Sequence, residues 1–438
     1  MSTSPKPKPR VFYGWYIVAT CFFIGFFSVG ARNAFGIFVI PMSEEFEWSR
    51  TTISLAAGLG FLVNGLTQPF LGYIFDKFGA RRVVLTGLVV IGLATMTLSF
   101  TFHILFLIFM FSFVLSTSLS SASVTNTMAL VSGWFVRRRA TAVGIASAGT
   151  QVGGMFLVPF AMYLLQATGW RMTWAVLGLL TLTVATPMAF LFIRNHPAMM
   201  GLRPDGDLES EDGDLDNRGE RRQGIYEVDQ WKQSFQTAPI WQLTGAYVVC
   251  GITTGLISTH FVPLAIDRGV SPSLAATIFG LMTGLNALGG IVASMLSDHF
   301  RRKNILAMVY LIRGVAFMLL VLIPGTAGLW AFALVAGVSW LASVPITASL
   351  TADIYGTRSL GTISGVTFLF HQVGSFSMIL LGGVFYDITG GYNLSFAVAG
   401  MFLFPAALLS FSIKEGKYSV RFGGTAAAPA PAPAGTGD

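Results

Sequence analysis

The chain has 438 residues, of which 53% are hydrophobic and only 11% are charged. Soluble domains carry about 25% charged residues, and a mean hydropathy of +0.68 is typical of helices that pack in lipid. This composition excludes a soluble enzyme, a nucleic-acid-binding protein and a disulfide scaffold, although the formal net charge is +7. The two cysteines, Cys21 and Cys250, lie in apolar stretches and are expected to pack rather than to bond.

About twelve apolar stretches are long enough to cross a bilayer as helices, which takes about 20 residues each. They predict an all-α integral membrane protein with twelve transmembrane helices. The predicted spans are 13–40, 51–75, 83–101, 104–131, 140–166, 171–193, 238–265, 272–297, 304–323, 328–350, 359–386 and 392–412. The residues before the first span are polar and basic, and the span itself is too long for the core of a cleavable signal.

Basic residues gather in every second short loop, and the alternate loops contain few of them. The clusters are Lys6, Lys8 and Arg10; Lys77, Arg81 and Arg82; Arg137, Arg138 and Arg139; Arg301, Arg302 and Lys303; and Lys414, Lys417 and Arg421. The first of the alternate loops is instead acidic, with Glu44, Glu45 and Glu47. The positive-inside rule therefore predicts a multi-pass protein of the inner membrane with both termini in the cytoplasm.

One long connection divides the spans six and six. Its middle, DGDLESEDGDLDNRGERR, is acidic and contains no aromatic residue, which predicts a solvated linker. The last residues are rich in Ala and Pro, which predicts a disordered tail. The expected units are an N-terminal six-helix bundle at 1–193, a cytoplasmic linker at 194–237, a C-terminal six-helix bundle at 238–415 and a cytoplasmic tail at 416–438.

The two halves carry the same residues in the same order, which indicates an internal repeat. The residues that recur 222 positions later are Pro41, Asn64 and Asp76, matched by Pro263, Asn286 and Asp298. Those that recur 221 positions later are Gln151-Val152-Gly153 and Thr168-Gly169, matched by Gln372-Val373-Gly374 and Thr389-Gly390. Several matches in register predict two pseudo-symmetric bundles of six helices.

This plan resembles that of the major facilitator transporters, in which two parallel six-helix repeats hold a binding site near the bilayer midplane. The loop GYIFDKFGARR at 72–82 is similar to the family's signature between helices 2 and 3. The resemblance implies that Asp76, Arg81 and Arg82 form charge pairs between helices and act in gating. The alternative is a basic loop that sets only the orientation in the membrane.

A closer resemblance, to monocarboxylate porters and bacterial oxalate/formate exchangers, rests on WFVRRRATAVGIASAG at 134–149 and on Tyr13-Gly14-Trp15-Tyr16. It implies transport of a small carboxylate. In one place the chain departs from these porters, which typically carry an acid and an arginine four residues apart in helix 8. Asn286 and Gly290 occupy the matching positions, which puts simple lactate-type substrates in doubt and leaves room for a bulkier one.

Ionisable groups inside membrane helices are costly and are therefore candidates for function. Arg32 lies within the first span, and an anionic substrate that pairs with its guanidinium is the simplest counter-charge. Monocarboxylate porters keep a cationic residue in this stretch, and the resemblance adds Asn33 beside it. The alternative is an arginine that reaches the lipid headgroups. Arg313 lies in the ninth span, and its role stays open between substrate binding and support of helix ends.

His371 and His260 are the histidines within predicted spans, and a histidine can carry a coupling proton near neutral pH. Oxalate exchangers hold a substrate-binding lysine in the stretch of His371, and the resemblance implies that His371 and the adjacent Gln372 contact the substrate. For both histidines the alternative is a packing residue that is hydrogen-bonded to a backbone carbonyl.

Three amides, Asn126, Gln151 and Asn286, lie in spans that face the cavity in this family and either bind substrate or join helices. We expect a proton symporter for a carboxylate-bearing organic anion that works by alternating access. The alternatives are an organic anion exchanger and, less favoured, a drug or metabolite exporter. The expected partners are the carboxylate, a proton and membrane lipid; no nucleic acid, cofactor, metal or enzymatic activity is expected.

Overall fold

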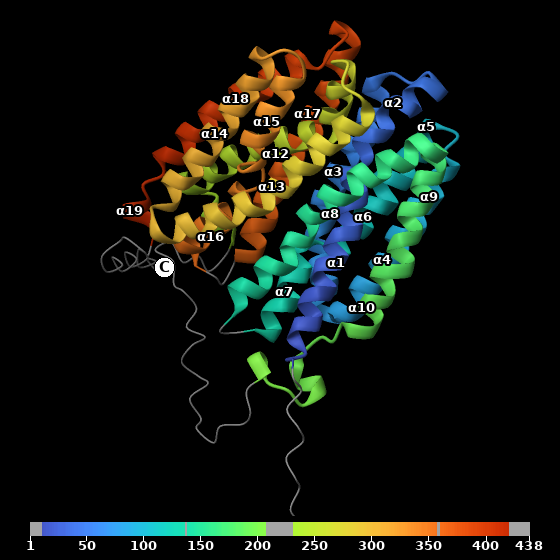
Figure 1. Ribbon diagram of the computed structural model, residues 1–438. Helices are drawn as coiled ribbons and strands as arrows, with labels where there is room; N and C mark the ends of the chain where they lie inside the picture. The colour runs from blue at the N-terminus through green and yellow to red at the C-terminus, as the bar shows by residue number, and fades with distance from the viewer. Residues whose placement is uncertain (1–10, 136–137, 207–230, 357–359, 420–438) are drawn as a thin grey trace, which may run out of the picture.

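The computed structural model describes residues 11–135, 138–206, 231–356 and 360–419, and within these residues it contains helices and no strand. In Figure 1 the helices of the first half, coloured blue to green, gather on one side, and those of the second half, yellow to red, gather on the other. The prediction of an all-α membrane fold is confirmed. Most of the predicted linker and tail lies outside the described residues.

The first half runs through thirteen consecutive helical segments, several of which join end to end within one span. They are α1 (Gly14–Asn33), α2 (Phe35–Phe46), α3 (Arg50–Phe78), α4 (Ala80–Thr97), η1 (Leu98–Phe100), α5 (Ile104–Leu107), η2 (Ile108–Leu115), α6 (Ser116–Ser121), α7 (Val124–Trp134), α8 (Arg139–Thr168), α9 (Trp170–Leu180), η3 (Thr181–Ala185) and α10 (Thr186–Phe192). Two short 3-10 turns follow, η4 (Pro197–Met200) and η5 (Pro204–Gly206).

The second half begins with a short helix and ends with another. Its segments are α11 (Trp231–Ser234), α12 (Ala238–Asp267), α13 (Pro272–His299), α14 (Arg302–Leu322), α15 (Gly325–Gly337), α16 (Ser343–Tyr355), α17 (Leu360–Thr389), α18 (Asn393–Ser412) and α19 (Glu415–Tyr418). Among the described residues ten helical stretches are long and apolar enough to cross a membrane. The first and tenth predicted spans contain the shorter apolar helices Gly14–Val29 and Gly325–Gly337 instead.

Interruptions divide the fourth and tenth spans at nearby but different positions of the repeat. Helix α6 ends at Ser121 and α7 begins at Val124, while α15 ends at Gly337 and α16 begins at Ser343. On the neighbouring helix of each bundle, Asn64 Nδ2 donates to the Ser116 carbonyl at 3.2 Å and Asn286 Nδ2 donates to the Gly337 carbonyl at 3.1 Å. The two asparagines occupy equivalent positions in the repeat and bond to equivalent carbonyls, at the start of α6 and at the end of α15; only the second of these borders an interruption.

The repeat also contains glycines at equivalent positions that have the same structural role in both halves. Gly169 and Gly390 end equivalent helices with φ of 83° and 73°, a left-handed conformation that only glycine adopts without strain. A Cβ on Gly153 would lie 2.3 Å from the Phe26 carbonyl oxygen, and a Cβ on Gly374 would lie 2.4 Å from the Val248 oxygen. The fifth and eleventh spans therefore approach the first and seventh closely enough to exclude any side chain.

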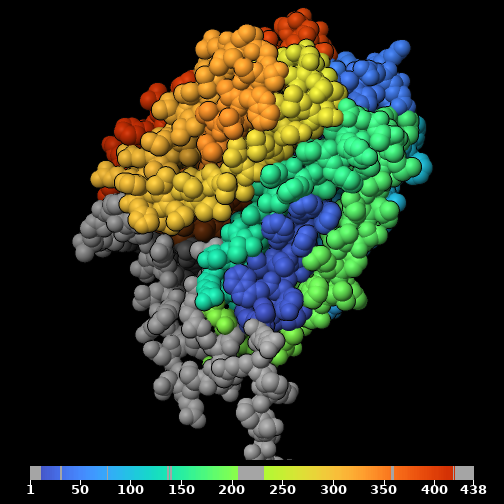
Figure 2. Space-filling view, viewed as in Figure 1, coloured from blue at the N-terminus to red at the C-terminus, as the bar shows by residue number. Residues whose placement is uncertain are grey.

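Most of the contact between the bundles is made by three pairs of helices: α3 with α17, α8 with α13, and α2 with α12. Figure 2 shows the second of these pairs as a continuous seam between the green and the yellow helices. The hydroxyl of Ser273 donates to Gln166 Oε1 at 2.7 Å near one end of this seam. That end, where α2 and α8 finish and α3 and α13 begin, is opposite to the end from which α1 starts.

Candidate functional site

Arg32 lies at the break between α1 and α2. Helix α1 ends at Asn33, Ala34 forms a turn and α2 begins at Phe35, so the guanidinium is held next to irregular backbone. Its Cζ lies 4.8 Å from the centroid of the Phe61 ring, and its Nε is buried without a hydrogen-bond partner. None of the carboxylates in the described part of the chain pairs with it. A membrane-embedded cation without a counter-charge is costly, which makes this position a candidate for binding an anion.

The amides differ in how much of their hydrogen-bonding capacity is in use. Asn126 donates to the carbonyls of Ser120 and Ser121 at 3.1 Å each, and so supports the interruption before α7. Asn286 bonds to the carbonyl of Gly337, the last residue of α15, as described above. Gln151 is half-buried, and its Oε1 is buried without a hydrogen bond. Gln151 thus has an unused acceptor for a ligand, whereas Asn126 and Asn286 use their amide donors in hydrogen bonds to helix carbonyls. Asn33 is half-buried beside Arg32.

A hydrogen-bonded chain crosses between the bundles at His371 and Gln372. Gln372 Nε2 donates to Asn64 Oδ1 at 2.9 Å, which links α17 to α3. Gln372 Oε1 lies 3.2 Å from His371 Nδ1, and the His371 ring stacks on Phe368 with centroids 5.7 Å apart. His371 Nε2 is buried without a hydrogen-bond partner. His371 therefore lies where a proton on the imidazole would be felt by both halves.

His260 is fully buried between helices. Its Nε2 lies 2.9 Å from the Ile379 carbonyl oxygen of α17, and its ring tilts against Tyr392 with centroids 4.9 Å apart. These are the contacts of a histidine that connects two helices of one bundle. Its role in binding stays a prediction, and the geometry favours His371 for the protonatable position.

Arg313 is fully buried within the second bundle, where it supports the interruption of the tenth span. Its Nη2 donates to the Ser339 carbonyl at 2.5 Å and to Ser343 Oγ at 3.3 Å. Its Nη1 donates to Thr253 Oγ1 at 3.2 Å and to Cys250 Sγ at 3.5 Å. The residue thus serves the irregular backbone between α15 and α16.

The basic loops hold helix ends within each bundle. Arg81 Nη2 donates to the Phe190 carbonyl at 2.9 Å, and the Arg81 backbone N–H donates to Asn195 Oδ1 at 2.9 Å. Arg82 is exposed, and the side chain of Asp76 lies outside the described part of the structure. The gating role of these three residues stays a prediction.

The matching loop of the second half contains a buried ion pair. Arg302 Nη1 lies 3.2 Å from Asp353 Oδ2, and their side chains are 8% and 0% exposed. The backbone N–H groups of Arg302 and Lys303 donate to the Glu415 carboxylate at 3.1 Å each. Helix α19 thereby caps the start of α14.

At the opposite end, a carboxylate of one bundle caps a helix of the other. Asp387 on α17 accepts hydrogen bonds from the backbone N–H groups of Arg50 and Thr51 at 3.1 and 3.0 Å, and from Thr51 Oγ1 at 2.5 Å. These groups form the first turn of α3, where a negative charge is favourable. We call this contact the Asp387 clamp; it holds the two bundles together at this end.

Glu45 near the same end ties α2 to α9. It accepts from the Trp170 indole at 2.5 Å and pairs with Arg171 at 2.5 Å. Burial by itself raises the pKa of this carboxyl, but the hydrogen bonds from Trp170 and Arg171 and the charge of Arg171 outweigh burial and hold the pKa below its usual value. The carboxylate is therefore ionised at neutral pH.

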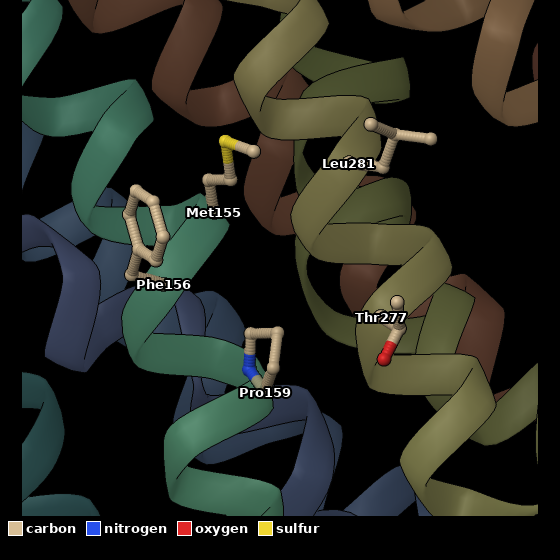
Figure 3. A pocket seen from close by; sticks show the side chains of 5 residues that line it. All are labelled: Met155, Phe156, Pro159, Thr277 and Leu281. Atoms are coloured by element: carbon tan, nitrogen blue, oxygen red, sulfur yellow. The ribbon is translucent and has the colours of Figure 1, made fainter.

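A cavity of about 320 Å³ opens at the seam between α8 and α13. Figure 3 shows Met155, Phe156 and Pro159 on one helix facing Thr277 and Leu281 on the other. The lining is apolar except for one hydroxyl, so it has no group that would pair with an ion. Among the described residues no cluster of three His, Cys, Asp or Glu could hold a metal.

Sequence reasoning overlooked three residues that the geometry singles out. The sequence marks Asn64 only as part of the repeat and Cys250 only as a packing residue, and it does not single out Asp387, yet each contacts a partner far along the chain. Of the three, only Asn64 could have been identified from the sequence, by its recurrence at Asn286. A polar residue inside an apolar span is costly, so its repetition indicates a structural or functional role.

Three comparisons agree with this architecture. Residues 21–379 match the model of the Major Facilitator Superfamily. An uncharacterized MFS-type transporter, YcxA of Bacillus subtilis, is 27% identical over 418 residues, which cover 93% of this chain and 96% of that protein. Monocarboxylate transporter 13 of Bos taurus is 24% identical over 393 residues, covering 89% and 87%.

A solved structure gives the same fold. A bacterial homolog of the human lysosomal transporter Spinster, inward-facing and unoccupied, superposes with a TM-score of 0.71 at 17% identity, covering 93% of this chain and 97% of the other. The matched model spans well over half of the present sequence. The chain therefore belongs to the major facilitator superfamily and is a multi-pass membrane transporter rather than an enzyme.

Proposed function

We propose that the protein moves a small carboxylate-bearing organic anion across the membrane together with a proton. The observation that carries the proposal is Arg32, a cation at a helix break whose guanidinium has no carboxylate partner among the described residues and whose Nε is unbonded. Curated relatives named as monocarboxylate transporters add support.

Arg32 would bind the carboxylate through two parallel hydrogen bonds, the geometry that the guanidinium fork favours. The Phe61 ring below the guanidinium limits its motion and excludes water from one face. Gln151, with its unbonded acceptor, would accept a hydrogen bond from a hydroxyl or amide of the substrate. Binding would also neutralise the cation, which lowers the cost of moving the site through the bilayer centre.

His371 would hold the coupling proton. Its Nδ1 contacts Gln372, which bonds to Asn64 of the other bundle, so a change of charge on the imidazole alters a link between the halves. An anion and a proton carried together leave the net charge of the loaded site unchanged. Uptake of the anion against an inside-negative potential then needs no additional work.

We further propose that the bundles 1–193 and 238–415 rock about this site in the inner membrane, joined by a cytoplasmic linker at 194–237. The positive-inside rule supports cytoplasmic termini, with the tail 416–438 on the same side. On this orientation the Asp387 clamp and the Gln166–Ser273 contact lie at the outer end. The conformation described is then closed to the outside.

The test is uptake into vesicles that contain the purified protein and an inward proton gradient, with a panel of radiolabelled mono- and dicarboxylates. Arg32→Gln should lower uptake about ten- to a hundredfold, because a hydrogen-bonded charge contributes about 1.5–3 kcal/mol. Arg171→Gln is the matched control, since that arginine is half-exposed and bound to Glu45. Equal uptake by wild type and Arg32→Gln, at equal expression, would refute the assignment.

The same vesicles separate symport from anion exchange. A symporter accumulates the carboxylate when the outside is acidified, whether or not the vesicles are preloaded. An exchanger requires preloading with an anion and ignores the proton gradient. Accumulation that depends only on preloading would reject the proton-coupled mechanism and leave Arg32 as the anion site.

A further inference from the structure

The guanidinium of Arg313 is a buried positive charge that requires a counter-charge. An arginine is always protonated in proteins, and Arg313 is fully buried. No carboxylate of the described residues forms an ion pair with it. Burial of a charge without a counter-charge strongly destabilises a folded protein. Of the groups that accept its hydrogen bonds, two hydroxyls and a carbonyl are neutral and cannot become anions at ordinary pH.

Cys250 is the remaining acceptor and the only one that can lose a proton. Its Sγ lies 3.5 Å from Arg313 Nη1 and 3.2 Å from Ser343 Oγ, with Thr254 Oγ1 at 3.9 Å. A thiolate is stabilised by a neighbouring cation and by hydroxyl donors, and these three contacts supply both. Cys21, the other cysteine, is also buried and free, but it has no such neighbours among the hydrogen bonds described.

His371 connects this thiol to the interface between the bundles. The centroid of the imidazole lies 4.7 Å from that of the Tyr247 ring, which is three residues before Cys250 on α12, and His371 Nε2 is buried without a hydrogen-bond partner. The other titratable groups around the sulfur are the phenols of Tyr247, on the same helix, and Tyr310, on α14 beside Arg313. Both phenols are neutral at ordinary pH, so Arg313 and His371 decide the charge of the thiol.

We propose that Cys250 is ionised, that its thiolate is the counter-ion of Arg313, and that it shares a proton with His371. With the thiolate and the guanidinium paired, the cluster is neutral. One added proton makes it an imidazolium beside a thiolate, and its net charge of +1 would balance one bound carboxylate. That last step, the use of the cluster as the coupling site, rests on the proposed function; the ionisation of Cys250 does not.

The ionisation is tested by ultraviolet difference spectroscopy, because a thiolate absorbs where a thiol does not. Cys21→Ser leaves Cys250 as the single cysteine and avoids any change to the cluster. The thiolate band should be present at neutral pH and should disappear on acidification. A band that appears only above the ordinary cysteine range, about pH 8.5, would overturn the proposal.

Further variants separate the partners of the thiolate. The matched single-cysteine protein Cys250→Ser, which retains Cys21, should show no band at neutral pH. Arg313→Lys should keep the band, and Arg313→Gln should lose it. His371→Gln should lose the band at a higher pH than the parent, because the cation that shares the proton is gone. An unchanged titration in His371→Gln would overturn the shared proton.

The coupling role is measured separately, in vesicles with a trapped pH-sensitive dye. For any carboxylate that the wild type transports, acidification outside the vesicles should stimulate uptake by Cys250→Ser at least tenfold less than uptake by the wild type. Full acid stimulation in this variant would remove the cluster from coupling. If the wild type takes up no carboxylate, the proposed function fails, while the spectra still decide whether Cys250 is ionised.

Discussion

The Asp387 clamp makes a quantitative prediction about the conformational equilibrium. Asp387→Ala removes three hydrogen bonds to the first turn of α3, two from backbone N–H groups and one from Thr51 Oγ1. The carboxylate is exposed, so the appropriate scale is that of a surface helix cap, about 1 kcal/mol, with about 0.3–1 kcal/mol more for the helix dipole. The clamp thus stabilises the contact between the bundles at this end by about 1.3–2 kcal/mol.

Because the clamp joins the two bundles, its loss affects only states in which they touch at this end. A change of about 1.3–2 kcal/mol raises the ratio of molecules in which this contact is open to those in which it is closed about ten- to thirtyfold. Asp387→Asn keeps one acceptor oxygen and should have roughly half the effect in free energy.

The assay is a distance distribution between spin labels at Glu47, in the first bundle, and Leu394, in the second; both side chains are exposed. Asp387→Ala should add a population at longer distance that the parent lacks. Glu44→Ala is the matched control, an exposed acid at the same end with no bond across the bundles among those described. If the distribution is unchanged while the melting temperature falls, the clamp stabilises the fold without gating it.

Three further predictions concern stability. The folded-state pKa of Glu45 is below its usual value, so the stability that this carboxylate contributes is present above the ordinary glutamate range and is lost as the pH falls through the folded pKa. Below about pH 4, the melting temperature should therefore fall more steeply with decreasing pH in the parent than in Glu45→Gln. Gly374→Ala should cost about 1–3 kcal/mol by forcing α12 from α17, whereas Gly144→Ala, which meets nothing within 4 Å, should melt like the parent. Asp353→Asn leaves the buried charge of Arg302 with the exposed Asp298 as its one acidic partner among the described residues, and thermal unfolding should report a loss of about 3 kcal/mol.

The fold could be predicted because the features that a chain needs to insert into a membrane are visible in its sequence. Each span must be long and apolar, and the recurrence of Asn64 at Asn286 and of Gly153 at Gly374 marks the duplication. The interruption between α15 and α16 could not be predicted, because its Ser339 carbonyl is satisfied by Arg313, which belongs to another helix. A local pattern carries no information about such a partner.

The candidate site was predictable only where a single residue is anomalous by itself. Arg32 is a charge inside an apolar run, and this alone identifies it. The thiol of Cys250 is ordinary in the sequence, and its partner Arg313 lies 63 residues away. Asp387 likewise acts on α3, more than 300 residues earlier in the chain. Packing of distant helices creates these sites, so they required coordinates.

The repeated asparagines bear on how the two halves differ. Asn64 and Asn286 recur at equivalent positions and make equivalent bonds, to the start of α6 and to the end of α15. Arg32 has no such counterpart, since Thr254 occupies the equivalent position in the second half. The support of the fourth and tenth spans is therefore common to both halves, whereas the cation of the first span belongs to one half alone.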